Sequence, residues 1–235
     1  MTRPIRHTAA VVLVLFAALL VNSNVLQIGE ASSLAANPHN VRAIYQQYDE
    51  QRGSIVVDGT AVARSVHTPG PLAYQRVYPG GAAYAPVTGT YSLVVGASGL
   101  EQAENPLLSG SGDELFLQRL RNEVSGRPAQ GGSVVTTLDA KAQQAAYAGL
   151  HGLKGAVVAL DPSTGAILAL ASSPSYDPAT LSTHDTAAIS RSYRSLLHDP
   201  DDPLVDRATS ETYPPGSLFK IVTASAAFSS GRFTP

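Results

Sequence analysis

The sequence contains no cysteine, and charged residues make up only 14% of its 235 residues. Without cysteine the chain can form neither a disulfide nor a thiolate metal site. This composition is compatible with an oxidising extracytoplasmic compartment, where unpaired thiols are a liability. The formal net charge is -2, so the chain offers no broad basic face for nucleic acid. We therefore expect a protein that binds no nucleic acid.

The sequence also lacks a pattern typical of metal sites. Its six histidines are scattered, with no His-x-x-x-His pair and no Asp/Glu/His cluster at ligand spacing. The acidic run at 199–203 lacks the ligand spacing and the glycine of a calcium loop. We interpret it as a solvated loop within a polar, irregular stretch over 182–203. We predict no metal and no cofactor.

The N-terminus contains a long uncharged apolar run. Arg3 and Arg6 precede this run, which covers residues 8–28. About 20 residues at a rise of about 1.5 Å span the roughly 30 Å hydrocarbon core of a bilayer, and N-terminal arginines keep that end cytoplasmic. We predict a cytoplasmic tail over 1–7, a single-pass anchor over 8–28 in the cell membrane, and an extracytoplasmic bulk. The alternative is a signal peptide cleaved near Ser33-Leu34-Ala35, which also exports the chain.

Residues 37–150 mix short β-like runs with helices, glycine and proline, which predicts an α+β region with long loops. A capping box at Ser111-Gly112-Asp113-Glu114 predicts a helix to Val124, and Asp139 caps a second helix from Ala140 to Leu150. The β-like runs are 54–57, 87–91 and 133–138. Nothing in this region by itself indicates a chemistry.

Two apolar runs, 156–160 and 166–171, flank the segment Asp161-Pro162-Ser163-Thr164-Gly165 and predict a β-hairpin. Proline suits the second position of a type I turn, and Gly165 can adopt the positive φ that closes it. Both strands are apolar throughout. We therefore expect them to be buried on both faces beneath covering helices.

Two prolines, Pro214 and Pro215, lead into an apolar helix fit for burial, with Ser217 in its first turn. Lys220 follows three residues later, so the two side chains point to nearly the same face. A desolvated, neutral lysine can take the proton of a serine, and a helix N-terminus favours the alkoxide. The Ser-x-x-Lys pattern is a weak signal by itself, because a surface lysine after a helix-start serine gives the same spacing.

Several segments in a fixed order together resemble class B penicillin-binding proteins, particularly the actinobacterial elongation-type members. The resemblance spans nearly the whole chain. The segments are Arg52-Gly53-Ser54-Ile55, Tyr78-Pro79-Gly80-Gly81, Tyr84 to Gly89, Gly99-Leu100-Glu101, Leu107 to Gly110, Val135 to Asp139 with the Gln143 helix, Thr164-Gly165, Ser173 to Pro178, Arg207-Ala208, and Tyr213 to Ser217.

The resemblance implies a fold with three parts: an N-terminal transmembrane helix, a non-catalytic α+β pedestal over 37–150, and the start of an α/β penicillin-binding transpeptidase domain over 155–235. That start consists of a β-hairpin and a nucleophile helix. The resemblance also implies that Ser217 is the nucleophile and Lys220 the base of a serine acyl-transfer reaction. The reaction would cross-link peptidoglycan stem peptides, which β-lactams mimic. Other implied partners are the membrane and proteins of cell-wall synthesis.

The chain departs from the family pattern in several places. Leu218 replaces the usual threonine, while Asp206 and Ala179 stand where asparagine is common. The Ser-x-Asn and Lys-Thr-Gly motifs do not occur in the printed sequence, whose lysines are Lys141, Lys154 and Lys220. These motifs carry the proton relay and carboxylate recognition in the family. We therefore expect a fragment that is inactive by itself, which leaves open whether this chain is an enzyme.

Two other functions are considered. One is a non-catalytic, membrane-tethered binding module of the cell-wall synthesis machinery. The other is a β-lactam sensor or β-lactamase relative, which shares Ser-x-x-Lys but not the pedestal segments. For Arg52 we favour a structural role that braces the pedestal. For Tyr78, Tyr84 and Tyr91 we favour half-buried core positions over a partner surface.

The predicted orientation can be tested with reporter fusions. Because cationic residues precede the uncharged run, we expect alkaline phosphatase fused after Asn37 to be active. A cytoplasmic reporter at the same point is the control and should be inactive. Activity of the cytoplasmic reporter alone would refute the orientation.

Overall fold

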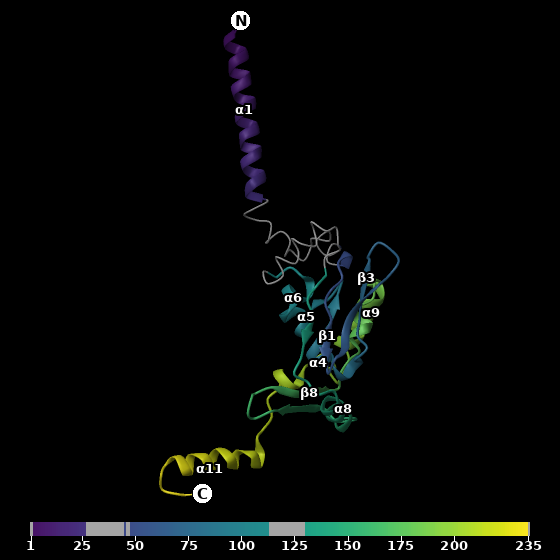
Figure 1. Ribbon diagram of the computed structural model, residues 1–235, viewed down its shortest axis with the longest axis vertical. Coiled ribbons are helices and arrows are strands. Elements are labelled where there is room, and N and C mark those ends of the chain that lie inside the picture. Colours follow the sequence, from purple (N-terminus) through teal and green to yellow (C-terminus); the bar gives the residue numbers. More distant parts are fainter. Residues whose placement is uncertain (1, 27–44, 46–47, 113–129, 235) are drawn as a thin grey trace.

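The computed structural model describes residues 2–26, 45, 48–112 and 130–234. A central body holds the sheets, and helices α1 (Thr2–Asn24) and α11 (Phe219–Ser229) project from opposite ends of it (Figure 1). The helix predicted to follow the Ser111 capping box lies over residues outside the described ranges. So does the alternative cleavage site near Ser33.

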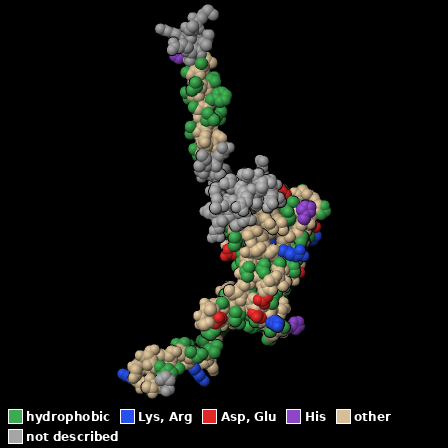
Figure 2. Space-filling view, in the orientation of Figure 1, with side chains coloured by type: hydrophobic (Ala, Val, Ile, Leu, Met, Phe, Trp, Pro, Cys, Tyr) green, Lys and Arg blue, Asp and Glu red, His purple; other side chains and the backbone are tan. Residues whose placement is uncertain are grey.

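Helix α1 matches the apolar run at the N-terminus. Its segment His7–Asn24 has a mean hydropathy of 1.7 and is long and apolar enough to cross a membrane. Its apolar side chains face outward along its length (Figure 2). A signal sequence has the same length and composition, so these properties alone do not separate an anchor from a signal. The helix begins at Thr2, within the segment assigned to the cytoplasmic tail.

The body is built on a mixed four-stranded sheet with the order β3-β2-β1-β6. Strand β1 pairs antiparallel with β2 and parallel with β6, and β2 pairs antiparallel with β3. Asp58 and Gly59 join β1 to β2 with φ values of 46° and 75°, as a tight hairpin turn requires. The predicted strands at 54–57 and 133–138 are present, the second shortened to two residues. The bounds are β1 Ile55–Val57, β2 Thr60–His67, β3 Tyr74–Val77 and β6 Val134–Val135.

The prediction of a strand over 87–91 is wrong. Helix α4 (Ala85–Thr88) covers its first half, and only Tyr91 belongs to a strand, β4 (Tyr91–Ser92), which pairs with β5 (Gly96–Ala97). Proline at the start of α4 carries a φ suited to a first helical turn. The Gly89 amide then bonds to the Ala85 carbonyl at 2.9 Å, which closes the turn.

The main core lies between the sheet and the short helices that cover it. Three tyrosines belong to the buried core, because Tyr78, Tyr84 and Tyr91 are all less than 10% exposed. This confirms the core interpretation for these tyrosines. The buried cluster is Ile55, Val57, Val62, Ala63, Tyr78, Ala83, Tyr84, Leu108 and Leu138, and a second cluster joins Tyr48, Leu72 and Tyr91.

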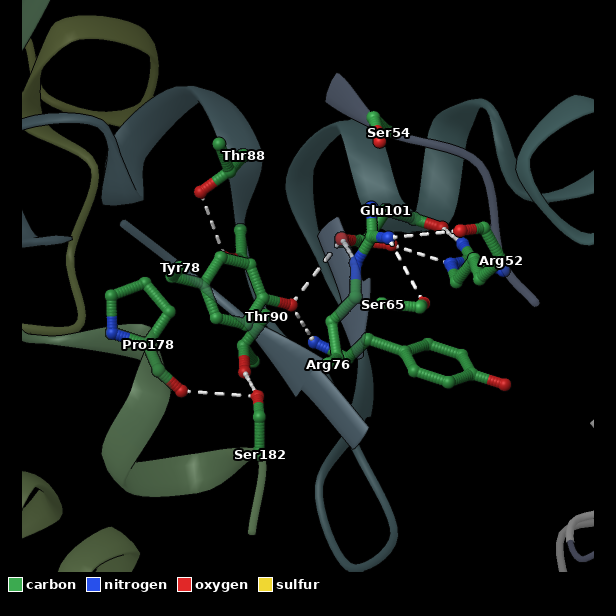
Figure 3. Close-up of polar contacts among 12 residues, drawn as sticks. Arg52, Ser54, Ser65, Arg76, Tyr78, Thr88, Thr90, Glu101, Pro178 and Ser182 are labelled. Carbon is green, nitrogen blue, oxygen red and sulfur yellow. Dashed lines mark hydrogen bonds and ion pairs between the residues drawn. The ribbon is translucent and has the colours of Figure 1, made fainter. Parts of the chain in front are cut away.

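One carboxylate, Glu101 of α5 (Gly99–Ala103), is completely buried between two arginines (Figure 3). Arg52 Nε donates to Glu101 Oε2 and Arg76 Nε donates to Glu101 Oε1, each at 2.6 Å. The Tyr78 hydroxyl donates to the same Oε1 at 3.3 Å. Burial, followed by the Glu101 carboxylate, raises the pKa of Tyr78, so its hydroxyl remains a donor at neutral pH.

The two guanidinium groups also bind backbone and side-chain oxygens. Arg52 donates to the Glu101 carbonyl at 2.6 Å and to Asn105 Oδ1 at 2.7 Å. Arg76 donates to the Gly53 carbonyl at 2.7 Å, and Arg52 Cζ lies 4.3 Å from the centre of the Tyr91 ring. Arg52 therefore braces the pedestal, as the sequence analysis favoured.

The predicted β-hairpin is present as β7 (Gly155–Leu160) paired antiparallel with β8 (Ile167–Ser173). Gly165 has a φ of 75°, and its amide bonds to the Asp161 carbonyl at 2.8 Å. The Asp161 carboxylate accepts bonds from Ser163 and Thr164, and these bonds lower its pKa. Helix α8 (Ala140–Gly149) is also where it was predicted, with Asp139 accepting from the Ala142 amide at 2.7 Å.

The expectation that both faces of this hairpin are buried is wrong for the described chain. Ala169 and Ala171 of β8 are fully buried, whereas Val158 and Leu160 of β7 are 45% and 57% exposed. Helix α8 packs on β8 and covers one face. Helices α8 and α10 (Arg207–Ser210) contact both strands, but they leave Val157, Val158 and Leu160 of β7 at least 37% exposed.

We predicted that the stretch over 182–203 is irregular, and this prediction is wrong for its middle part. It contains helix α9 (Thr186–Leu197), with Asp185 as N-cap accepting from the Ala187 and Ala188 amides at 2.9 Å. Ile189 is completely buried. The signals present in the sequence were the N-cap and the helical spacing of Ile189, Tyr193 and Leu196, set among polar residues.

Replacing Glu101 should destabilise the fold strongly, because two buried guanidinium groups would lose their carboxylate. For Glu101→Gln we expect the free energy of unfolding to fall by about 3–5 kcal/mol. Urea denaturation of the purified protein measures it. The exposed Lys154–Asp202 pair, at 3.5 Å, supplies the control: Lys154→Ala should cost below about 1 kcal/mol. Equal, small effects of both substitutions would contradict the central role of Glu101.

Candidate active site

Ser217 lies at a rigid junction between an extended segment and a helix. The preceding Pro214 and Pro215 restrict the backbone, and Gly216 has a φ of 53°, in the left-handed region. Ser217 belongs to the 3₁₀ turn η5 (Gly216–Leu218), which passes directly into α11. The predicted helix is therefore present, although Ser217 lies in the 3₁₀ turn before it.

Lys220 is the second residue of α11, three positions after Ser217. Residues i and i+3 lie above one another where a turn is of the 3₁₀ type, which places both side chains on one side of the junction. No hydrogen bond joins these two described side chains. Catalytic hydrogen bonds commonly form only in the substrate complex, so this geometry remains compatible with a nucleophile and its base.

The junction and α11 are exposed, although the apolar residues of this helix fit it for burial. Leu218 and Ile221 are 71% and 66% exposed, and α11 extends away from the body (Figure 1). No described residue covers Lys220. A lysine becomes neutral at physiological pH when burial or neighbouring cations disfavour its charged form. The described residues supply the spacing of the pair but not its desolvation.

The segment that leads to Ser217 starts from a well-capped turn of helix, α10 (Arg207–Ser210). The Asp206 carboxylate accepts from the Ala208 amide at 3.1 Å and from Thr209 Oγ1 at 2.6 Å. Aspartate and asparagine are equally good N-caps. Aspartate at position 206, where the family commonly has asparagine, therefore still caps the helix.

A cleft of about 270 Å³ lies at the junction of the pedestal and the hairpin unit. Both units contribute to its wall, but Ser217 and Lys220 are not part of it. Burial raises the pKa of Tyr176 in this wall. The polar residues of the wall are Ser98, Ser172, Ser175, Tyr176, Asp206 and Thr209.

Gln143 of α8 links the pedestal to the hairpin. Its side chain is completely buried, and its Nε2 donates to the Ala83 carbonyl at 2.7 Å and to the Leu170 carbonyl at 2.9 Å. The Leu170 amide donates back to Gln143 Oε1 at 2.8 Å. In the sequence Gln143 appeared only as part of the family resemblance. Its linking role could not be found there, because all three bonds go to distant backbone groups.

Comparisons with known families match the two units separately. Residues 52–134 match the model described as the penicillin binding protein A dimerisation domain. Residues 155–235 match the penicillin binding protein transpeptidase domain, which contains the Ser217 junction. The order of these two domains behind an apolar N-terminal helix defines the class: the chain belongs to the class B penicillin-binding proteins.

Within this class the chain is similar to the peptidoglycan D,D-transpeptidases named PbpA. It is 47% identical to that of Mycolicibacterium smegmatis and 45% identical to that of Mycobacterium tuberculosis, in each case over 98% of this chain and 48% of the relative. The imipenem acyl-enzyme complex of penicillin-binding protein A from M. tuberculosis superimposes with a TM-score of 0.77 and 48% identity. That match covers 80% of this chain and 44% of the other. The chain thus spans about half the length of these relatives.

The left-handed backbone at Gly216 gives a test of the junction. An alanine there would meet no other atom, but its φ would cost about 1–2 kcal/mol. On the proposal made below that Ser217 is acylated, and for the protein expressed from its native gene, we expect Gly216→Ala to slow acylation by a fluorescent penicillin about 10-fold, since about 1.4 kcal/mol corresponds to that factor. Gly152→Ala, also at an open left-handed position (φ 74°), is the matched control and should react at the wild-type rate. Equal rates for both variants would show that the Gly216 conformation does not matter.

Proposed function

We propose that the protein is a membrane-anchored peptidoglycan D,D-transpeptidase in which Ser217 is the nucleophile and Lys220 is the base. The observation that carries this proposal is the rigid junction that presents Ser217 with Lys220 three residues later. It lies within the segment that matches the transpeptidase domain. The acyl-enzyme complex of the similar mycobacterial protein supports the same chemistry here.

In the proposed reaction, Ser217 Oγ attacks the carbonyl carbon of the penultimate D-alanine of a stem peptide. The serine proton passes to Lys220 Nζ and then to the leaving amine of the terminal D-alanine, as the amide C–N bond breaks. An amine of a second stem peptide then attacks the ester carbonyl. This forms the cross-link and returns the proton to Ser217.

β-Lactams are the second proposed ligand class. Attack by Ser217 Oγ on the lactam carbonyl opens the ring, and the leaving nitrogen stays attached to the acyl group. No product can then diffuse away to admit a second stem peptide. The ester therefore persists as the acyl-enzyme.

We infer that the apolar segment over 8–28 anchors the protein in the cell membrane with its bulk outside the cytoplasm. The length and hydropathy of α1 support this location, as do Arg3 and Arg6 ahead of the apolar run. Peptidoglycan stem peptides lie on that side. The proposed division is a tail over 1–7, an anchor over 8–28, a pedestal over 37–150 and the transpeptidase unit over 155–235.

A binding role for the pedestal is the second candidate function. Residues 52–134 match a dimerisation domain, which supports contact with a second copy or with other proteins of cell-wall synthesis. Such binding needs no chemistry at Ser217. The two functions can therefore be separated by substitution of Ser217.

Covalent labelling tests the enzymatic proposal on the protein expressed from its native gene. We expect a fluorescent penicillin to label the protein, Ser217→Ala to abolish labelling, and Lys220→Ala to slow it by about 10²- to 10⁴-fold because the base is lost. Gel fluorescence measures the adduct. Ser225→Ala, on the exposed face of α11, is the matched serine control and should label normally. Labelling that survives Ser217→Ala, or no labelling of the wild type, would refute the assignment of Ser217.

A further inference from the structure

Arg207 is another buried arginine, and it lies shortly before Ser217 in the chain. Its guanidinium donates to the Asp201 carbonyl at 2.6 Å and to the Asp202 carbonyl at 3.2 Å. It also donates to the Pro174 carbonyl at 3.4 Å, and its backbone amide donates to Ser172 Oγ at 3.0 Å. These bonds fix the start of α10 to the end of β8.

The remaining nitrogen of this guanidinium faces Glu211. Arg207 Nε makes no hydrogen bond and lies 3.5 Å from Glu211 Oε1, the distance of an ion pair. The other carboxylate oxygen, Glu211 Oε2, accepts from the Tyr213 hydroxyl at 2.7 Å. One carboxylate thus connects a buried arginine to the residue that precedes Pro214.

The hydroxyl of Tyr213 remains a donor over the physiological pH range. Its hydrogen bond to Glu211 is the largest cause of a raised pKa, because ionisation would place two negative charges side by side. Within the described chain, no other hydrogen bond or ion pair joins residues 213–218 to the body. Glu211 and Tyr213 thus supply a side-chain contact between the buried Arg207 and the segment that leads to Ser217.

The segment after Tyr213 can transmit the orientation of Tyr213. Pro214 and Pro215 each have a ring-restricted φ, and the Leu218 amide bonds to the Pro215 carbonyl at 3.0 Å. Two of the φ torsions between Tyr213 and Ser217 are therefore fixed by proline rings. A rotation at Tyr213 therefore displaces Ser217.

We propose that Arg207, Glu211 and Tyr213 form a positioning bridge that holds Ser217 in the orientation required for acyl transfer. This inference rests on the proposed function. Among the described contacts, no hydrogen bond or ion pair joins any of the three to Ser217 Oγ, so they act as positioning residues. Because Glu211 and Tyr213 are partly solvent-exposed, their contacts contribute little to overall stability. Their effect lies in geometry, where a displacement of about 1 Å can cost about 100-fold in rate.

The experiment follows acylation by a fluorescent penicillin in the protein expressed from its native gene. Time courses at several penicillin concentrations give three quantities: the dissociation constant of the initial complex, the first-order acylation rate constant, and the fraction of protein labelled. For Tyr213→Phe and for Glu211→Ala we expect the rate constant to fall about 10-fold, from partial misplacement of Ser217. The dissociation constant and the labelled fraction should stay within about 2-fold of the wild type, a change worth about 0.4 kcal/mol.

Three further variants sharpen the test. Tyr193→Phe removes a hydroxyl that has no hydrogen-bond partner in the described chain, so it should leave all three quantities unchanged. The double variant Glu211→Ala/Tyr213→Phe should be no slower than the slower single variant, because both changes break one bridge. Arg207→Lys keeps the charge but loses the forked donors, and it should also lower the rate constant.

The outcomes are distinguishable. If the Ser217→Ala variant is labelled as the wild type is, the proposed function itself is refuted, and the bridge with it. A wild type labelled at Ser217, with rate constants in Tyr213→Phe and Glu211→Ala equal to its own, would overturn the bridge alone. A loss of labelled fraction at an unchanged rate constant would also overturn it, because that result marks a purely structural role.

Discussion

The completely buried Glu101 carboxylate, held between Arg52 and Arg76, is the interaction on which the pedestal depends. It joins the segment before β1, strand β3 and helix α5. Burying three charges carries a large desolvation cost, which is offset only where the geometry is good and the remaining N–H groups find acceptors. The carbonyls of Gly53 and Glu101 supply two of these acceptors. The cluster therefore admits few alternative arrangements of these three segments.

Polar side chains that bind backbone groups connect this centre to the end of the chain that carries Ser217. Gln143 connects the pedestal to β8, and Arg207 connects β8 to α10. Each is buried and each binds backbone carbonyl groups of segments distant from its own. Beyond Glu211 such contacts end among the described residues, and Ser217 lies on an exposed junction. The proposed reaction depends on how firmly this last segment is held.

The parts of the fold that were predictable have local causes. The turn at Asp161 to Gly165 and the cap at Asp139 are made by neighbours in sequence, and both are present. The strand predicted over 87–91 failed because a proline-started helical turn competes with the β-propensity of Val87 and Thr88. Helix α9 was missed because its few apolar residues are separated by polar ones, although its N-cap and spacing were visible.

The sequence by itself determined the apolar N-terminal run, the hairpin and the Ser217-x-x-Lys220 spacing, and its ordered segments carried the resemblance to class B penicillin-binding proteins. These features depend on residues a few positions apart. The tertiary structure alone decided that Glu101 pairs with Arg52 and Arg76, 49 and 25 positions away in the chain. It also decided that Gln143 joins two units. Such pairings follow from how distant segments pack, because burial and the low dielectric of the interior exist only once the chain has folded.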